Sequence, residues 1–137
     1  MFSNTQKRKF LITKNLPEKS RRVFNSEKLF DIIKNMKVVT IKNDIDNFIL
    51  ELDSRTQAKV LRCLDLLEYN GNNLGMPYSK SLRNGLFELR VVGERHVRII
   101  YCFHKNTIYL LHAFIKKTNK IPSKELALAV KRYKLLA

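Results

Sequence analysis

The chain has 137 residues, 45% of them hydrophobic, which is the usual length of one domain and enough for one continuous core. No apolar run approaches the roughly 20 residues of a membrane span, and the basic stretch Lys7-Arg8-Lys9 precedes too few apolar residues for a signal peptide. With 27 Lys and Arg against 12 Asp and Glu, the formal charge of +15 indicates a polyanionic partner or, alternatively, only a solvated basic surface.

The first 35 residues differ from the rest of the chain. Residues 1–25 carry scattered Lys, Arg and Asn with no strong period, which is typical of an arm. Ser26 is expected to cap a short helix that ends near Met36. We therefore predict a basic, partly helical N-terminal arm over 1–35 and one folded domain over 36–137.

The folded domain is expected to begin with a short strand over 38–41 and a helical hairpin. Ile45, Phe48, Ile49 and Leu52 follow at the spacing of one helix face. Ser54 is expected to cap a second helix, which Gly71 ends because glycine accepts the left-handed conformation at helix ends.

Three strands are expected over 86–92, 96–103 and 107–114, joined by short connections that predict antiparallel hairpins. Ser123 is expected to cap a last helix that runs to about Leu136. The order β-α-α-β-β-β-α predicts an α+β domain, with the helical hairpin and the C-terminal helix on one face of a small antiparallel sheet.

Side chains two apart on a strand share a face, so alternation divides the polar residues of the sheet from its core. Glu88, Arg90, His96 and Arg98 are expected on the face that the helices leave open. We also expect Lys80 there, with Lys116 and Lys117 at its rim.

Converging cations are what cleavage of a phosphodiester by its own 2′-oxygen requires, because negative charge builds on the phosphoryl oxygens. Such cleavage also needs a general base and a general acid. The candidates for these roles are His96, His112, Glu88, Tyr101 and a lysine whose pKa neighbouring cations lower.

Each candidate also has an ordinary structural interpretation. Glu88 and Arg90 could form a surface pair, and His112 could be a core histidine that shares a face with Ile108, Leu110 and Phe114. His96 beside a turn and the Lys116-Lys117 pair could be merely solvated. Spacing alone does not separate a nuclease from a sheet that only binds RNA.

No competing motif is present in the sequence. It has no glycine-rich phosphate loop, no metal-spaced His/Cys set and no two-metal acidic cluster, so we expect metal-free chemistry without a cofactor. Cys63 and Cys102 lie far apart outside any Cys-x-x-Cys pair, which predicts reduced core thiols and a cytoplasmic setting.

Four phrases in order resemble the phage-derived HigB-like branch of the RelE/ParE superfamily of type II toxins. They are LGMPYSKSL over 74–82, GLFELR over 85–90, VRIIY over 97–101 and LHAFIKKT over 111–118. The resemblance runs from about Met36 to the C-terminus. It implies a RelE-like fold, a ribosome-dependent endoribonuclease that cuts mRNA and so inhibits translation, and a cognate antitoxin, usually a small helix-turn-helix protein.

The resemblance also implies roles for individual residues. Arg98 matches the superfamily arginine that contacts the scissile phosphate, Arg90 matches the arginine of the Glu-Leu-Arg phrase, and Lys116 and Lys117 match the basic pair after the last strand. Relatives end in a catalytic His-Tyr or use a tyrosine of the last helix; here only Tyr133 is present, and the acid and base stay open.

The predicted site is therefore as follows. The catalytic candidates are Arg98, Arg90, Lys116, Lys117 and His112. The RNA-binding candidates are Lys80, Arg83, Glu88, Arg95, His96, Thr118 and Lys120. The expected partners are mRNA, the ribosome and the antitoxin, with no membrane; the alternatives are a ParE-like gyrase poison and a non-catalytic RNA-binding module.

Overall fold

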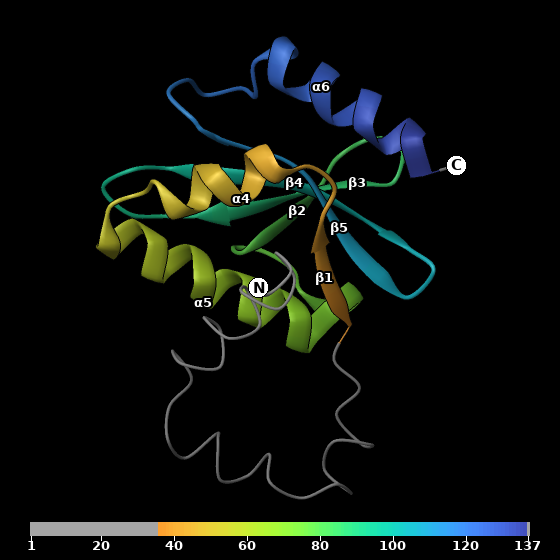
Figure 1. Cartoon of the computed structure of the whole chain (residues 1–137), viewed down its shortest axis with the longest axis horizontal. Helices are drawn as coiled ribbons and strands as arrows, with labels where there is room; N and C mark the ends of the chain where they lie inside the picture. Colours follow the sequence, from red (N-terminus) through yellow and green to blue (C-terminus); the bar gives the residue numbers. More distant parts are fainter. Residues whose placement is uncertain (1–35, 137) are drawn as a thin grey trace, which may run out of the picture.

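A five-stranded sheet in the order β1-β5-β4-β3-β2 forms the centre of the computed structural model, which describes residues 36–136 (Figure 1). The predicted arm and the Ser26 helix lie outside these residues. The strands are β1 (Lys37–Thr40), β2 (Ser79–Ser81), β3 (Leu86–Val91), β4 (Val97–His104) and β5 (Thr107–Ile115). The helices are α4 (Asn43–Leu50), α5 (Ser54–Asn70) and α6 (Ser123–Tyr133), with short 3-10 turns η1 (Gly71–Asn73) and η2 (Lys134–Leu136).

The predicted α+β class is confirmed, and the sheet is mixed at one edge. Strands β2 to β5 are antiparallel to their neighbours, whereas β1 runs parallel to β5 with Lys37 opposite Thr107. Strand β2 is not among the predicted strands, because three residues are too few to show an alternating pattern.

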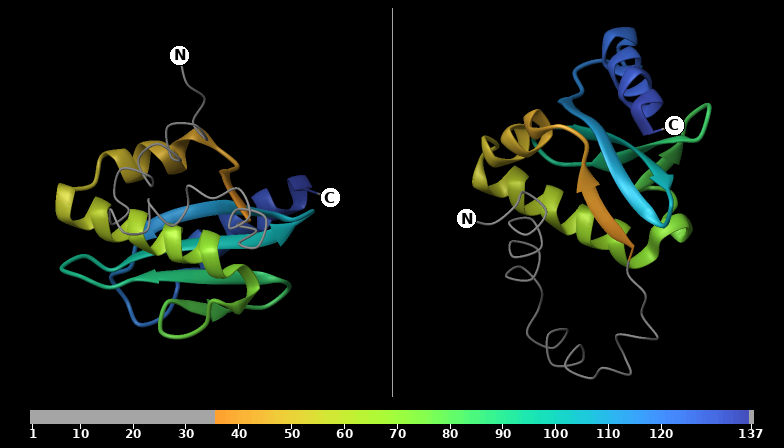
Figure 2. Two further views of the ribbon diagram at one scale, coloured as in Figure 1. Left: turned by 90° about the horizontal axis from the view of Figure 1, so that it is seen from below. Right: turned by 45° about the vertical axis from the view of Figure 1, so that its right-hand side comes forward.

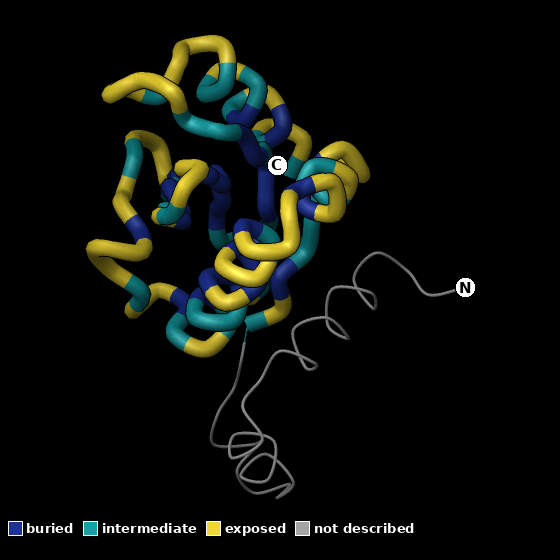
Figure 3. Tube along the Cα trace, turned by 90° about the vertical axis from the view of Figure 1, so that its left-hand side faces the viewer, coloured by how far each residue is buried: buried dark blue, intermediate teal, exposed yellow. Residues whose placement is uncertain are grey.

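Helices cover both faces of the sheet, so the prediction that all helices share one face is wrong for α6 (Figures 1 and 2). The first face packs against α4 and α5, with Ile45, Leu64, Leu89, Ile99 and Leu110 in its core. The second face packs against α6, with Leu86, Ile100, Leu111, Phe114 and Ala129 in its core. Figure 3 shows buried segments along the strands and exposed outer turns of the helices.

Two helices begin differently from the prediction. The N-cap of α5 is Asp53, whose Oδ2 accepts a hydrogen bond of 3.1 Å from the Thr56 N–H, and Ser54 is the first helical residue. Pro122 precedes α6 and makes no side-chain cap, so Ser123 is again the first helical residue. Within residues 36–136, no helix combines the length and the apolar character needed to cross a membrane.

A β-bulge in β5 changes the faces on which its residues lie. Ile100 is opposite His112 and Tyr101 is opposite Leu110, so Leu111 is an extra residue. His112 therefore lies on the α6 face, and the predicted sharing of one face with Ile108 and Leu110 is wrong. The alternation could not reveal this shift because the strand is apolar on both sides.

We propose that the domain boundary lies at Met36, whose backbone N–H donates to Glu68 O over 3.2 Å and whose side chain packs against the first core. A protein that begins at Met36 should keep the melting temperature of the full chain, because the core contacts of residues 36–136 are retained. Thermal melting of both proteins tests this. A melting temperature lower by about 5 °C or more, on the order of 1 kcal/mol, would move the boundary upstream.

Candidate nucleic-acid interface

The strand register brings the predicted polar residues into two cross-strand rows on the face that carries α6. The first row runs across β2, β3, β4 and β5 through Lys80, Glu88, Ile100 and His112. The second row runs across β3, β4 and β5 through Arg90, Arg98 and Phe114. Residues that pair across strands share a face, so Lys80, Glu88 and the arginine pair (Arg90 and Arg98) lie together.

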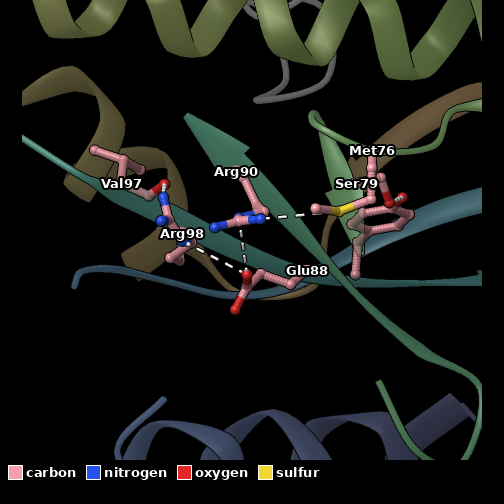
Figure 4. Close-up of polar contacts among 7 residues, drawn as sticks. Met76, Ser79, Glu88, Arg90, Val97 and Arg98 are labelled. Atoms are coloured by element: carbon pink, nitrogen blue, oxygen red, sulfur yellow. Dashed lines mark hydrogen bonds and ion pairs between the residues drawn. The ribbon is translucent and has the colours of Figure 1, made fainter. Parts of the chain in front are cut away.

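Glu88 sits between the two arginines (Figure 4). One of its oxygens, Oε1, lies 3.6 Å from Arg90 Nε and 3.6 Å from Arg98 Nε. Arg98 Nη1 also donates to Val97 O over 3.0 Å, and Arg90 Nη1 lies 3.8 Å from Met76 Sδ. One carboxylate thus faces two guanidinium groups, which leaves an excess positive charge on this part of the sheet.

The two arginines differ in exposure. Arg98 is only 4% exposed and Glu88 only 3%, whereas the Arg90 side chain is partly open to solvent. The expectation that Glu88 and Arg98 lie on an open surface is therefore wrong, because α6 packs on this face against Phe114, the residue opposite Arg98. Arg90 is the member of the pair that an incoming anion can reach.

Burial and the neighbouring charges act on Arg98 in opposite directions. Burial lowers the pKa of its guanidinium, Glu88 raises it, and Arg90 lowers it further. The ordinary pKa of arginine is so high that the group stays charged at neutral pH. Within residues 36–136, the buried Nε atoms of Arg90 and Arg98 have no hydrogen-bond partner, so their contacts of 3.6 Å with Glu88 are ion pairs without hydrogen bonds.

Lysines flank the arginine pair on either side. Lys80 is exposed on the edge strand β2, opposite Glu88. The Lys116 N–H donates to His96 O over 2.7 Å, which places these two residues side by side beyond Arg98. Lys117, Thr118 and Lys120 are exposed in the connection to α6. Lys116 and the exposed residues that follow it therefore lie at one end of the sheet face that carries α6.

Other predicted residues lie elsewhere. Arg95 Nε is 4.0 Å from Asp53 Oδ1 at the start of α5, on the other side of the sheet. Arg83 is in the turn before β3, about 14 Å along the strand direction from Arg90. Tyr133 is at that same distant end, because a Cβ on Gly85 would lie 3.3 Å from its hydroxyl. The structure does not bring these three side chains to the arginine pair.

His112 connects the sheet to α6. Its Nε2 contacts Glu125 Oε2, and its ring stacks on Phe114 with the centroids 5.6 Å apart. The side chain is mostly buried, with 12% of its surface exposed, at the border between the polar rows and the α6 core. Through this contact His112 helps to hold α6 against the sheet, in addition to the catalytic role predicted for it.

Tyr101 lies on the other face and is completely buried. Its hydroxyl is 2.5 Å from Ser79 Oγ, and burial raises its pKa while that hydrogen bond opposes the shift. Tyr101 is therefore separated from the arginine pair by the sheet itself. Cys63 and Cys102 are free and buried as predicted, and burial raises the pKa of Cys102 to about 11.

Sequence reasoning missed Arg132, a buried residue of α6. Its Nη1 donates to Leu111 O over 2.9 Å and its Nη2 donates to Asp44 Oδ2 over 2.7 Å. The carbonyl it binds belongs to the residue of the bulge, where the regular strand ladder is interrupted. No motif marks such a contact, since its partners come from α4 and from an irregularity of β5.

The chain matches a family of known proteins. The family model described as "Phage derived protein Gp49-like (DUF891)" matches residues 47–134, which includes both polar rows and the whole of α6. No curated protein matches the chain. Within residues 36–136, His, Cys, Asp and Glu side chains do not gather in any group of three that could hold a metal ion.

Proposed function

This chain belongs to the Gp49-like family of phage-derived proteins, and from that membership we propose that it is the toxin of a type II toxin–antitoxin system. The family is associated with the RelE-like toxins of such systems. Among these toxins we assign the chain to the HigB-like branch, as a ribosome-dependent endoribonuclease that cuts mRNA. Its partners are mRNA, the ribosome and a small helix-turn-helix antitoxin, all in the cytoplasm.

The observation that carries this proposal is the arginine pair around Glu88, flanked by Lys80 and Lys116 on one face of the sheet. When a ribose 2′-oxygen attacks the adjacent phosphate, the phosphoryl oxygens gain negative charge that fixed cations stabilise. Arg90 has the exposure to contact that phosphate directly. Arg98 does not contact the phosphate in this proposal. It holds Glu88 in place and adds its own positive charge to the site.

We assign proton transfer to side chains at the borders of the two cross-strand rows. The 2′-hydroxyl must lose a proton and the departing 5′-oxygen must gain one. His96 and Lys116 lie together at one end of the site, and His112 lies beside Ile100 at the other border. These side chains supply both roles without a metal ion in the proposed mechanism.

Primer extension on cellular mRNA after brief induction tests the proposal. We expect new 5′ ends inside reading frames within minutes of induction, and none after induction of the Arg90→Ala protein at equal abundance. Intact mRNA together with DNA-damage signals would replace the proposal with a gyrase poison. Intact mRNA with RNA bound but uncut would replace it with a non-catalytic binding module.

A further inference from the structure

Two large apolar side chains are exposed beside the arginine pair. Met76 is 62% exposed and Tyr78 is 44% exposed, and both lie in the segment that leads into β2. Folded proteins expose single apolar residues routinely. These two differ because their neighbours are cations: Met76 Sδ is 3.8 Å from Arg90 Nη1 (Figure 4), and Lys80 follows two residues after Tyr78.

Tyr78 lies in the turn directly before the edge strand β2, next to the cross-strand row that contains Arg90 and Arg98. Ser79 is opposite Leu89, so the next antiparallel position places Tyr78 opposite Arg90. The hydrogen bond of 2.7 Å from Arg90 N–H to Tyr78 O agrees with that register. The phenol ring therefore starts from the same face as Arg90, on the segment that enters β2 and is hydrogen-bonded to Arg90.

The backbone around Tyr78 is held in place by several hydrogen bonds. The N–H groups of Tyr78 and Ser79 both donate to Gly75 O over 3.1 Å. The Ser79 side chain is tied to the buried Tyr101 hydroxyl on the opposite face. A ring on a fixed backbone loses little conformational entropy when a flat ligand stacks on it, which favours binding.

We propose that Tyr78, with Met76 beside it, is a stacking platform for one unpaired base of single-stranded RNA. The neighbouring phosphate then lies on Arg90. Proteins that bind single strands combine cations along the backbone with aromatic rings under the bases, and this row has both in adjacent positions. A duplex offers no free base face here, so the platform selects unpaired RNA. The inference rests on the proposed function for its substrate class.

The test measures binding of a short single-stranded RNA by fluorescence anisotropy to the full chain. The RNA is 2′-O-methylated, so it cannot be cut, and one of its bases is 2-aminopurine, whose fluorescence is quenched on stacking. Tyr78→Ala should weaken binding about ten-fold, within the range measured for loss of one stacked base, and abolish the quenching. Tyr78→Phe keeps the ring and should behave like the wild type.

Tyr69→Ala is the matched control, because Tyr69 is 55% exposed on α5, which covers the other face of the sheet. It should leave both signals unchanged, and all three variants should melt like the wild type. Unchanged affinity and quenching with Tyr78→Ala overturn the inference. Equal weakening by Tyr78→Phe also overturns it, because the hydroxyl rather than the ring would then matter.

The result of this binding experiment can be distinguished from the result of the primer-extension experiment that tests the proposed function. The RNA probe cannot be cut and no ribosome is present, so the measurement does not depend on cleavage. A wild-type protein that cuts mRNA while Tyr78→Ala binds RNA normally defeats only the stacking platform. A wild-type protein that binds through Tyr78 yet leaves cellular mRNA intact defeats only the nuclease.

Discussion

Replacement of Arg98 by alanine should lower the free energy of unfolding by about 3 kcal/mol, because it breaks a buried ion pair and leaves Glu88 with Arg90 alone. That corresponds to a melting temperature lower by about 15 °C. The same variant should cleave RNA about 100-fold more slowly, since a preorganised charge near the transition state is lost. Urea denaturation and a growth assay at equal expression measure the two effects.

Arg90→Ala is the informative companion variant. Arg90 is partly exposed, so solvent weakens its ion pair with Glu88, and Arg98 still compensates that carboxylate in the variant. The loss of Arg90 should therefore change the free energy of unfolding by less than about 1 kcal/mol. Its cleavage rate should nevertheless fall about 100-fold, because Arg90 is the arginine that can touch the phosphate. Growth arrest at the wild-type level by either variant would remove the arginine pair from the catalytic site.

Replacement of Arg132 by alanine should lower the free energy of unfolding by about 3 kcal/mol. The Leu111 carbonyl would stay buried without its donor, which costs about 1–3 kcal/mol, and the packing of the arginine stem would be lost as well. Because α6 would be held less firmly, its amide protons should exchange faster than those of α5. Denaturant unfolding and hydrogen exchange provide the two measurements.

Asp44→Asn is the control for the charge of this contact. The Asp44 side chain is about half exposed, so solvent screens its pair with Arg132, and the variant should cost less than about 1 kcal/mol. An equal loss in Asp44→Asn and Arg132→Ala would contradict the assignment. The ion pair, rather than the hydrogen bond to the bulge, would then hold α6 to the sheet.

Much of the sheet could be predicted because alternation in β3 and β4 is regular. Glu88 and Arg90 alternate with buried Leu89 and Val91, and the structure places Arg98 opposite Arg90 as that pattern requires. The exposure of these side chains could not be predicted from the same pattern. Alternation assigns a residue to a face of the sheet, whereas the exposure depends on what packs over that face.

The position of α6 and the bulge depend on contacts that join distant parts of the chain. The α6 sequence shows an apolar side, but nothing in its spacing says which face of the sheet that side covers. In β5, apolar residues lie on both sides of the strand, so one extra residue at Leu111 leaves no trace in the pattern. The hydrogen bond from Arg132 to the Leu111 carbonyl can be understood only when the position of α6 and the bulge are both known.

The parallel pairing of β1 with β5 also constrains how the protein acquires its shape during synthesis. Lys37 and Thr107 are about 70 residues apart, so closing this edge costs more chain entropy than forming the hairpins β3–β4 and β4–β5. The hairpins that contain Arg90 and Arg98 can form first, while β1 must wait for β5 to leave the ribosome. The sheet that supports the arginine pair is thus complete only once Ile115 has left the ribosome.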